Sequence, residues 1–65
     1  MKNLRLKSAR AAMDLSQQQL ADAVGVSRQT INAIENNKYD PTLSLAFHLA
    51  RELESTVDAL FTPDP

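Results

Sequence analysis

The stretch SRQTINAIE, residues 27–35, combines an apolar pair with polar side chains that can form hydrogen bonds. If it is a helix, Ile31 and Ile34 mark its buried side, because residues three apart are neighbours on a helix surface. The opposite side carries no acid and consists of Arg28, Gln29, Asn32 and Ala33. An ordinary solvated face favours Glu and Lys, which are strong helix formers. This row of residues therefore indicates a surface that hydrogen-bonds to a partner.

Composition narrows the class of protein to a small globular domain. The 65 residues lie near the lower limit for unaided folding, and 43% of them are hydrophobic. With no cysteine and one histidine, the chain cannot form a disulfide and offers few ligands for a transition metal. No apolar run approaches the roughly 20 residues of a membrane helix, and the first ten residues lack a signal-peptide core. We expect one cytoplasmic domain over residues 1–65, with no cofactor.

The charge is unevenly distributed along the chain. Residues 1–38 carry six Lys and Arg against three acids, a net charge of +3, whereas residues 39–65 carry a net charge of −4. A polarised domain can bind a polyanion with one side and keep its acids on the other. The alternative is that the basic N-terminal part is only a solvated helix.

Capping residues and apolar spacing predict five short helices and no strand. The first spans about residues 3–13, with Asn3 as its cap, and the second begins at a capping box led by Ser16. Gly25 ends the second helix in a left-handed conformation, and Ser27 caps the third. The connection between these two helices is short, which predicts a helix-turn-helix over about residues 16–35.

The last two helices follow a polar loop. Thr42 caps the fourth, Ser55 or Thr56 caps the fifth, and Pro63 ends it. The inward-facing side chains expected on the first, fourth and fifth helices are Leu6, Met13, Leu43, Ala46, Phe47, Ala50, Leu53, Val57, Leu60 and Phe61.

The run LSQQQLADAVGVSRQTINAIENNKYDPTLSLA resembles the lambda-repressor-like, Cro-type (XRE) helix-turn-helix DNA-binding domains, in particular their small single-domain repressors. The similarity covers about residues 4–61. It implies an all-α, compact five-helix fold with a central helix-turn-helix. It also implies a sequence-specific transcriptional regulator, a repressor that binds a palindromic operator in double-stranded DNA as a homodimer.

In that family the third helix lies in the major groove with its N-terminal residues at base edges. Arg28 can donate to guanine O6 and N7, Gln29 or Asn32 can pair with adenine, and Ala33 can approach a thymine methyl. An acid here would be repelled by phosphate. Taken alone, Arg28 could equally be an ordinary surface charge.

The resemblance also implies flanking phosphate contacts and one structural ion pair. Helix N-termini and loop cations suit phosphate, and the expected contacts are Gln17, Gln18, Ser27, Thr30, Asn36, Lys38 and Tyr39. Each could instead be a cap or loop residue. Arg10 and Glu35 match positions that form a buried ion pair between the first and third helices, so we expect them not to touch DNA.

A second hypothesis is a protein-interaction module of the same fold, such as an antitoxin that neutralises a partner. An enzyme is not expected, because the sequence has no nucleophile–base pair, metal cluster or phosphate-cradling glycine loop. Nor do we expect a membrane partner or a small-molecule site.

Overall fold

The computed structural model describes residues 5–61, and this part of the chain forms five helices and no strand. The helices are α1 (Leu6–Ala12), α2 (Gln17–Val24), α3 (Arg28–Glu35), α4 (Leu43–Glu52) and α5 (Val57–Leu60). The first begins later than expected, after Arg5, which makes no side-chain capping bond. The expected roles of Asn3 as a cap and of Pro63 as a stop lie outside the described residues.

Four of the helices begin at a hydroxyl side chain that accepts a backbone N–H from three residues further on, at 3.0–3.2 Å. These caps are Ser16, Ser27, Thr42 and Thr56. Each bond satisfies one of the N–H groups that the first turn of a helix leaves without a partner. The capping box at the start of α2 is complete, because the Gln19 side chain accepts the Ser16 N–H at 2.8 Å.

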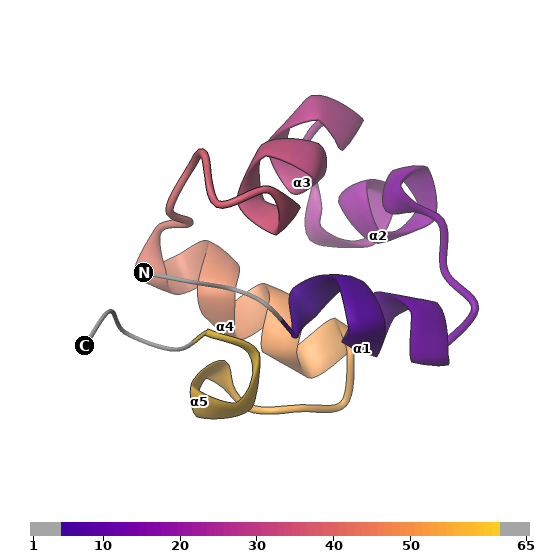
Figure 1. Ribbon diagram of the computed structural model, residues 1–65, viewed down its shortest axis with the longest axis vertical. Coiled ribbons are helices and arrows are strands. Elements are labelled where there is room, and N and C mark those ends of the chain that lie inside the picture. The colour runs from indigo at the N-terminus through magenta and orange to yellow at the C-terminus, as the bar shows by residue number, and fades with distance from the viewer. Residues whose placement is uncertain (1–4, 62–65) are drawn as a thin grey trace.

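The turn between α2 and α3 depends on Gly25, whose φ is +75° and ψ is +33°. The next N–H, from Val26, donates to Ala21 O at 3.0 Å and closes the end of α2. Only glycine adopts this left-handed conformation without a steric cost from Cβ. The chain therefore leaves α2 sharply and enters α3 beside it, as Figure 1 shows.

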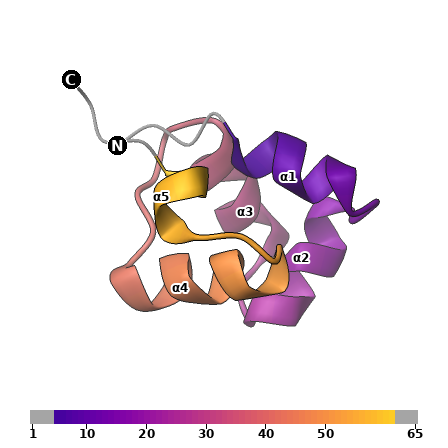
Figure 2. The ribbon, with the colours of Figure 1, turned by 90° about the horizontal axis from the view of Figure 1, so that it is seen from below.

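The core lies between the helices: α2 packs against α3 and α4, and α5 packs against α4 (Figures 1 and 2). Its buried side chains are Leu6, Leu20, Ala21, Ile31, Ile34, Ala46, Leu49, Ala50, Leu53, Leu60 and Phe61. These come from all five helices, so each short helix is held by tertiary packing rather than by its own propensity.

The prediction that Met13, Leu43 and Phe47 lie in the core is wrong. Met13 is 36% exposed, Leu43 is 70% exposed and Phe47 is 56% exposed. On α4 the buried residues recur at steps of three and four from Ala46 and include Leu49, which the sequence analysis missed. Leu43 and Phe47 fall outside that stripe, because successive residues turn by about 100° around a helix. Met13 follows the last residue of α1, where the helical register no longer directs it inward.

The expected ion pair between Arg10 and Glu35 is present and joins α1 to the end of α3. Arg10 Nε lies 2.7 Å from Glu35 Oε2 and Nη2 lies 3.3 Å from Oε1, with the two side chains 13% and 2% exposed. Arg10 Nη1 also donates to Leu15 O at 2.7 Å, and Gln17 Nε2 donates to Glu35 Oε1 at 3.0 Å. One network thus ties α1, the α1–α2 loop, α2 and α3 together.

We expect Gly25→Ala to lower the free energy of unfolding by about 1–2 kcal/mol. Apart from Gly25 and its two chain neighbours, no atom lies within 4 Å of the position its Cβ would take, so the cost comes from the backbone conformation and not from a clash with the surroundings. Gly25→Asn is the matched control and should lose less, because Asn tolerates a left-handed conformation better than Ala. Urea unfolding at one protein concentration measures both. An alanine variant as stable as the parent would contradict the argument.

We expect Glu35→Ala to destabilise the protein by about 3–5 kcal/mol, because it leaves the Arg10 guanidinium buried without its partner. The double variant Arg10→Met with Glu35→Leu removes both charges and should recover most of that loss. Urea unfolding of the two variants and the parent gives the comparison. If the double variant is less stable than Glu35→Ala, the loss does not come from an unpaired charge.

Candidate nucleic-acid interface

The helix-turn-helix presents one face of α3 to solvent. Ile31 and Ile34 are fully buried and anchor the helix, while Arg28, Gln29 and Asn32 are exposed. Neither the Arg28 side chain nor the Gln29 side chain has a hydrogen-bond partner among residues 5–61. Both side chains can therefore bind an external group without breaking a bond within the described structure.

Ala33 and Thr30 complete the α3 surface and are both half-buried. Ala33 adds no polar group beside Asn32. The hydroxyls of Thr30 and Ser27 lie 3.0 Å apart, and the same Ser27 oxygen accepts the Thr30 N–H. Ser27 thus acts as a helix cap and lies at the positive end of the α3 dipole, a position that favours an anion.

Two glutamines at the start of α2 have partners within the chain. Gln17, half-buried, donates one amide hydrogen to Glu35, which leaves one hydrogen and the amide oxygen unused. Gln18 donates to Asp22 Oδ1 at 2.8 Å, one turn further along α2. The contact from Gln17 to the Arg10–Glu35 pair was missed by the sequence analysis, because residues 18 positions apart carry no local signal of contact.

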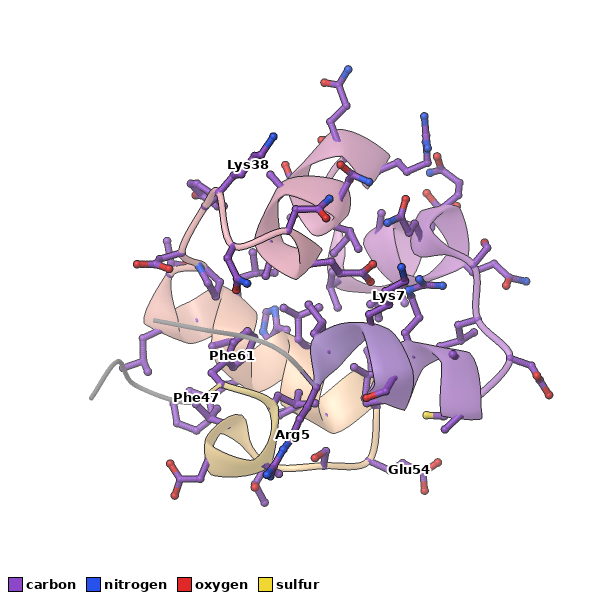
Figure 3. All side chains as sticks on the ribbon, in the orientation of Figure 1. Arg5, Lys7, Lys38, Phe47, Glu54 and Phe61 are labelled. Atoms are coloured by element: carbon purple, nitrogen blue, oxygen red, sulfur yellow. The ribbon has the colours of Figure 1, made fainter. Side chains whose placement is uncertain are left out.

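The loop after α3 carries the remaining candidates. Lys38 and Tyr39 are exposed, and Lys38 points away from the body of the molecule on the side of α3 (Figure 3). Asn36 ends α3 and donates from Nδ2 to two atoms of Asn32, the backbone O at 2.9 Å and Oδ1 at 3.1 Å. The structure therefore brings the expected base-reading and phosphate-binding residues to α3, its loop and the start of α2.

The described part of the chain was also compared with the requirements of a metal site and of a membrane helix. Residues 5–61 contain no group of three or more His, Asp or Glu side chains that could hold a metal ion. None of the helices in that range is long and apolar enough to cross a membrane. An open hollow between α2 and α4 is lined by Ala23, His48, Arg51 and Glu52.

Known proteins are similar to this chain in sequence and in fold. A helix-turn-helix family model (HTH_3) matches residues 6–60. MJ0272 of Methanocaldococcus jannaschii, described as an HTH-type transcriptional regulator, is 51% identical over 61 residues, which are 94% of this chain and 91% of that protein.

Two solved structures superpose over most of the chain. The P22 c2 repressor in complex with a synthetic operator matches with a TM-score of 0.88 and 26% identity, over 95% of this chain and 94% of that one. The restriction-modification controller protein C.AhdI of Aeromonas hydrophila matches with a TM-score of 0.83 and 30% identity, over 91% and 89%. These matches confirm the expected all-α repressor fold. The chain belongs to the XRE-type helix-turn-helix family of transcriptional regulators.

Proposed function

We propose that this protein is a sequence-specific repressor that binds a palindromic operator as a homodimer, with α3 in the major groove. The observation that carries the proposal is the exposed face of α3, which holds Arg28 and Gln29 without partners among the described residues and has no acid. The P22 c2 repressor, similar in fold, was solved with a synthetic operator.

The base contacts follow from the chemistry of the side chains. Arg28 donates two hydrogen bonds, to guanine O6 and N7. Gln29 pairs with the edge of an adenine or donates to an acceptor on another base. Asn32 reads a neighbouring base, and Ala33 is small enough to contact a thymine methyl. With Ile31 and Ile34 packed in the core, these residues are held on a rigid helix rather than on a loop.

Phosphate contacts flank this face in the proposal. Lys38 supplies a cation on one side, with Tyr39 next to it. On the other side, the N-termini of α2 and α3 offer backbone N–H groups and a positive dipole end near Gln17 and Ser27. Gln18 and Thr30 are additional donors, from α2 and α3. These contacts position the protein and carry no sequence information.

Dimerisation is supported by an apolar pair on α4. Leu43 and Phe47 are one turn apart, 70% and 56% exposed, and together form an apolar ridge. In Figure 3, Phe47 lies on the side of α5 whereas Lys38 lies on the side of α3, so Phe47 is separate from the proposed DNA surface. A second copy would cover the ridge, and a two-fold dimer sets two α3 helices about 34 Å apart, one turn of DNA.

The experiment that tests the proposal is selection of bound duplexes from a random DNA pool at two salt concentrations. Enrichment of a palindrome whose half-sites lie about one helical turn apart supports a dimeric, sequence-specific regulator. If no sequence is enriched and weak binding disappears with added salt, the proposal fails. The surface of α3 would then be better explained by a protein partner, as in an antitoxin.

We expect Arg28→Ala or Gln29→Ala to reduce discrimination at particular base pairs by about 1–3 kcal/mol, because each removes a base-edge hydrogen-bonding group. Competition binding with duplexes altered at single base pairs measures this. An Arg28→Ala variant with an unchanged base preference would show that α3 does not read the groove as proposed.

Lys38→Ala is the matched control for these variants. It should weaken binding to all duplexes alike and reduce the dependence of binding on salt by about one phosphate contact. Because Lys38 is an exposed loop residue, its loss should leave the folded domain intact.

We expect Phe47→Glu to shift the protein from dimer to monomer, because it puts a charge into an interface that buries the apolar ridge. His48→Glu is the control: it adds the same charge to the same helix, at the hollow beside α2. Sedimentation equilibrium of both variants gives the oligomeric state. If Phe47→Glu dimerises like the parent, the ridge is not the interface.

A further inference from the structure

Asn36 and Asn32 form a pair at the C-terminal end of α3, one helical turn apart. The Asn36 amide nitrogen lies 2.9 Å from Asn32 O and 3.1 Å from Asn32 Oδ1. Both residues are exposed, and Asn32 is on the α3 face proposed to read bases. The pair therefore links the residue that ends the helix to a residue of the reading surface.

The chemistry of the contact fixes the orientation of both carboxamides. A backbone carbonyl can only accept, so the Asn36 atom that faces Asn32 O must be the amide nitrogen and not the oxygen. The same nitrogen faces the Asn32 side chain, and a donor needs an acceptor there. The Asn32 atom at 3.1 Å is therefore its oxygen, and its own amide nitrogen points the other way.

This arrangement leaves Asn36 without a donor for phosphate. Its amide nitrogen donates to both oxygens of Asn32, and its backbone N–H also donates to Asn32 O, at 3.1 Å. Only the side-chain oxygen remains, and neither it nor a phosphate oxygen can donate. The phosphate contact expected of Asn36 from the sequence would require this pair to break.

The pair leaves Asn32 with an amide donor, Nδ2, whose orientation is fixed. Its Nδ2 group has no partner among the described residues, so both amide hydrogens are available. Acceptors on base edges in the major groove are guanine O6 and N7, adenine N7 and thymine O4. Holding the amide in one orientation before binding removes part of the ordering cost of the contact.

We infer that Asn36 is a positioning residue, which holds the Asn32 carboxamide so that its Nδ2 group donates to one base pair in each half-site. The inference rests on the proposed function, because it assigns a role within the same DNA surface. It places one specificity-determining contact under the control of a residue that itself touches no base.

The test compares Asn36→Ala with Asn32→Ala on the selected operator and on duplexes altered at each base pair. Asn36→Ala should reduce discrimination at one base pair per half-site by about threefold to tenfold, in line with the loss of one hydrogen bond, and leave the salt dependence unchanged. Asn32→Ala should affect the same base pair. The double variant should be no worse than Asn32→Ala, because the two residues act as one unit.

Two controls keep the result interpretable. Asn36→Gly removes the same amide with a residue that helix C-termini tolerate, and it should reproduce Asn36→Ala. Lys38→Ala should instead weaken binding uniformly and reduce the salt dependence. Circular dichroism of each variant confirms that α3 is folded before binding is compared.

The outcomes separate this inference from the proposed function. If the parent enriches a consensus but Asn36→Ala keeps every base preference, or lowers the salt dependence by about one phosphate, the positioning role is overturned alone. The same holds if the two single variants affect different base pairs. If the parent enriches no sequence at all, the proposed function fails and the inference fails with it.

Discussion

The buried contact between Arg10 and Glu35 holds the helix-turn-helix in one arrangement. Removing two charges from water is costly, and that cost is offset only when the remaining donors and acceptors also find partners. Here the third guanidinium nitrogen bonds to Leu15 O and the second carboxylate oxygen accepts from Gln17. The first residue of α2 and the last residue of α3 therefore meet at one carboxylate, which fixes the relative position of the two helices that would face DNA.

Several acids of the second half of the chain belong to elements other than α3 and its loop. Of the acids in the second half, Glu52 and Asp58 lie on α4 and α5, and Glu54 lies between these helices. The cations Arg28 and Lys38 belong to α3 and its loop. A net charge of −1 is thus compatible with binding a polyanion, because attraction depends on the local field at the contact and falls off within about 10 Å in 0.1 M salt.

Local features of the structure were predictable from the sequence, and features that depend on packing were not. Caps at Ser16 and Thr42 and the left-handed Gly25 follow from neighbouring backbone groups, which the sequence places within a few residues. The spacing of apolar residues on α4 could not separate buried Leu49 from exposed Phe47, because Leu and Phe occur all around that helix. Which side faces the core depends on how α2 and α5 approach it.

In the candidate site, too, some features could be predicted from the sequence and others depend on the tertiary structure. The exposed row on α3 was visible in the sequence, since a short amphipathic helix leaves only one side to solvent. The partners of its residues were less visible. Asn32 and Asn36 are four residues apart, a spacing that allows a side-chain pair on any helix. Asparagine is, however, also a typical turn residue, so the sequence did not single out this pair. The engagement of Gln17 by Glu35 needed the tertiary structure, because it spans two helices.

If α3 reads bases as proposed, two copies of the domain would discriminate between sequences better than one. An eight-residue helix with two or three base-reading side chains gives about 1–3 kcal/mol of discrimination for each good contact. Specific binding typically exceeds non-specific binding by about 4–10 kcal/mol. Two or three such contacts on one α3 would give about 2–9 kcal/mol, and two copies on a palindrome would use every contact twice. Under the proposed function, the exposed apolar ridge on α4 and the polar row on α3 would serve one requirement: the ridge would join two copies, and the two α3 helices would read the palindrome together.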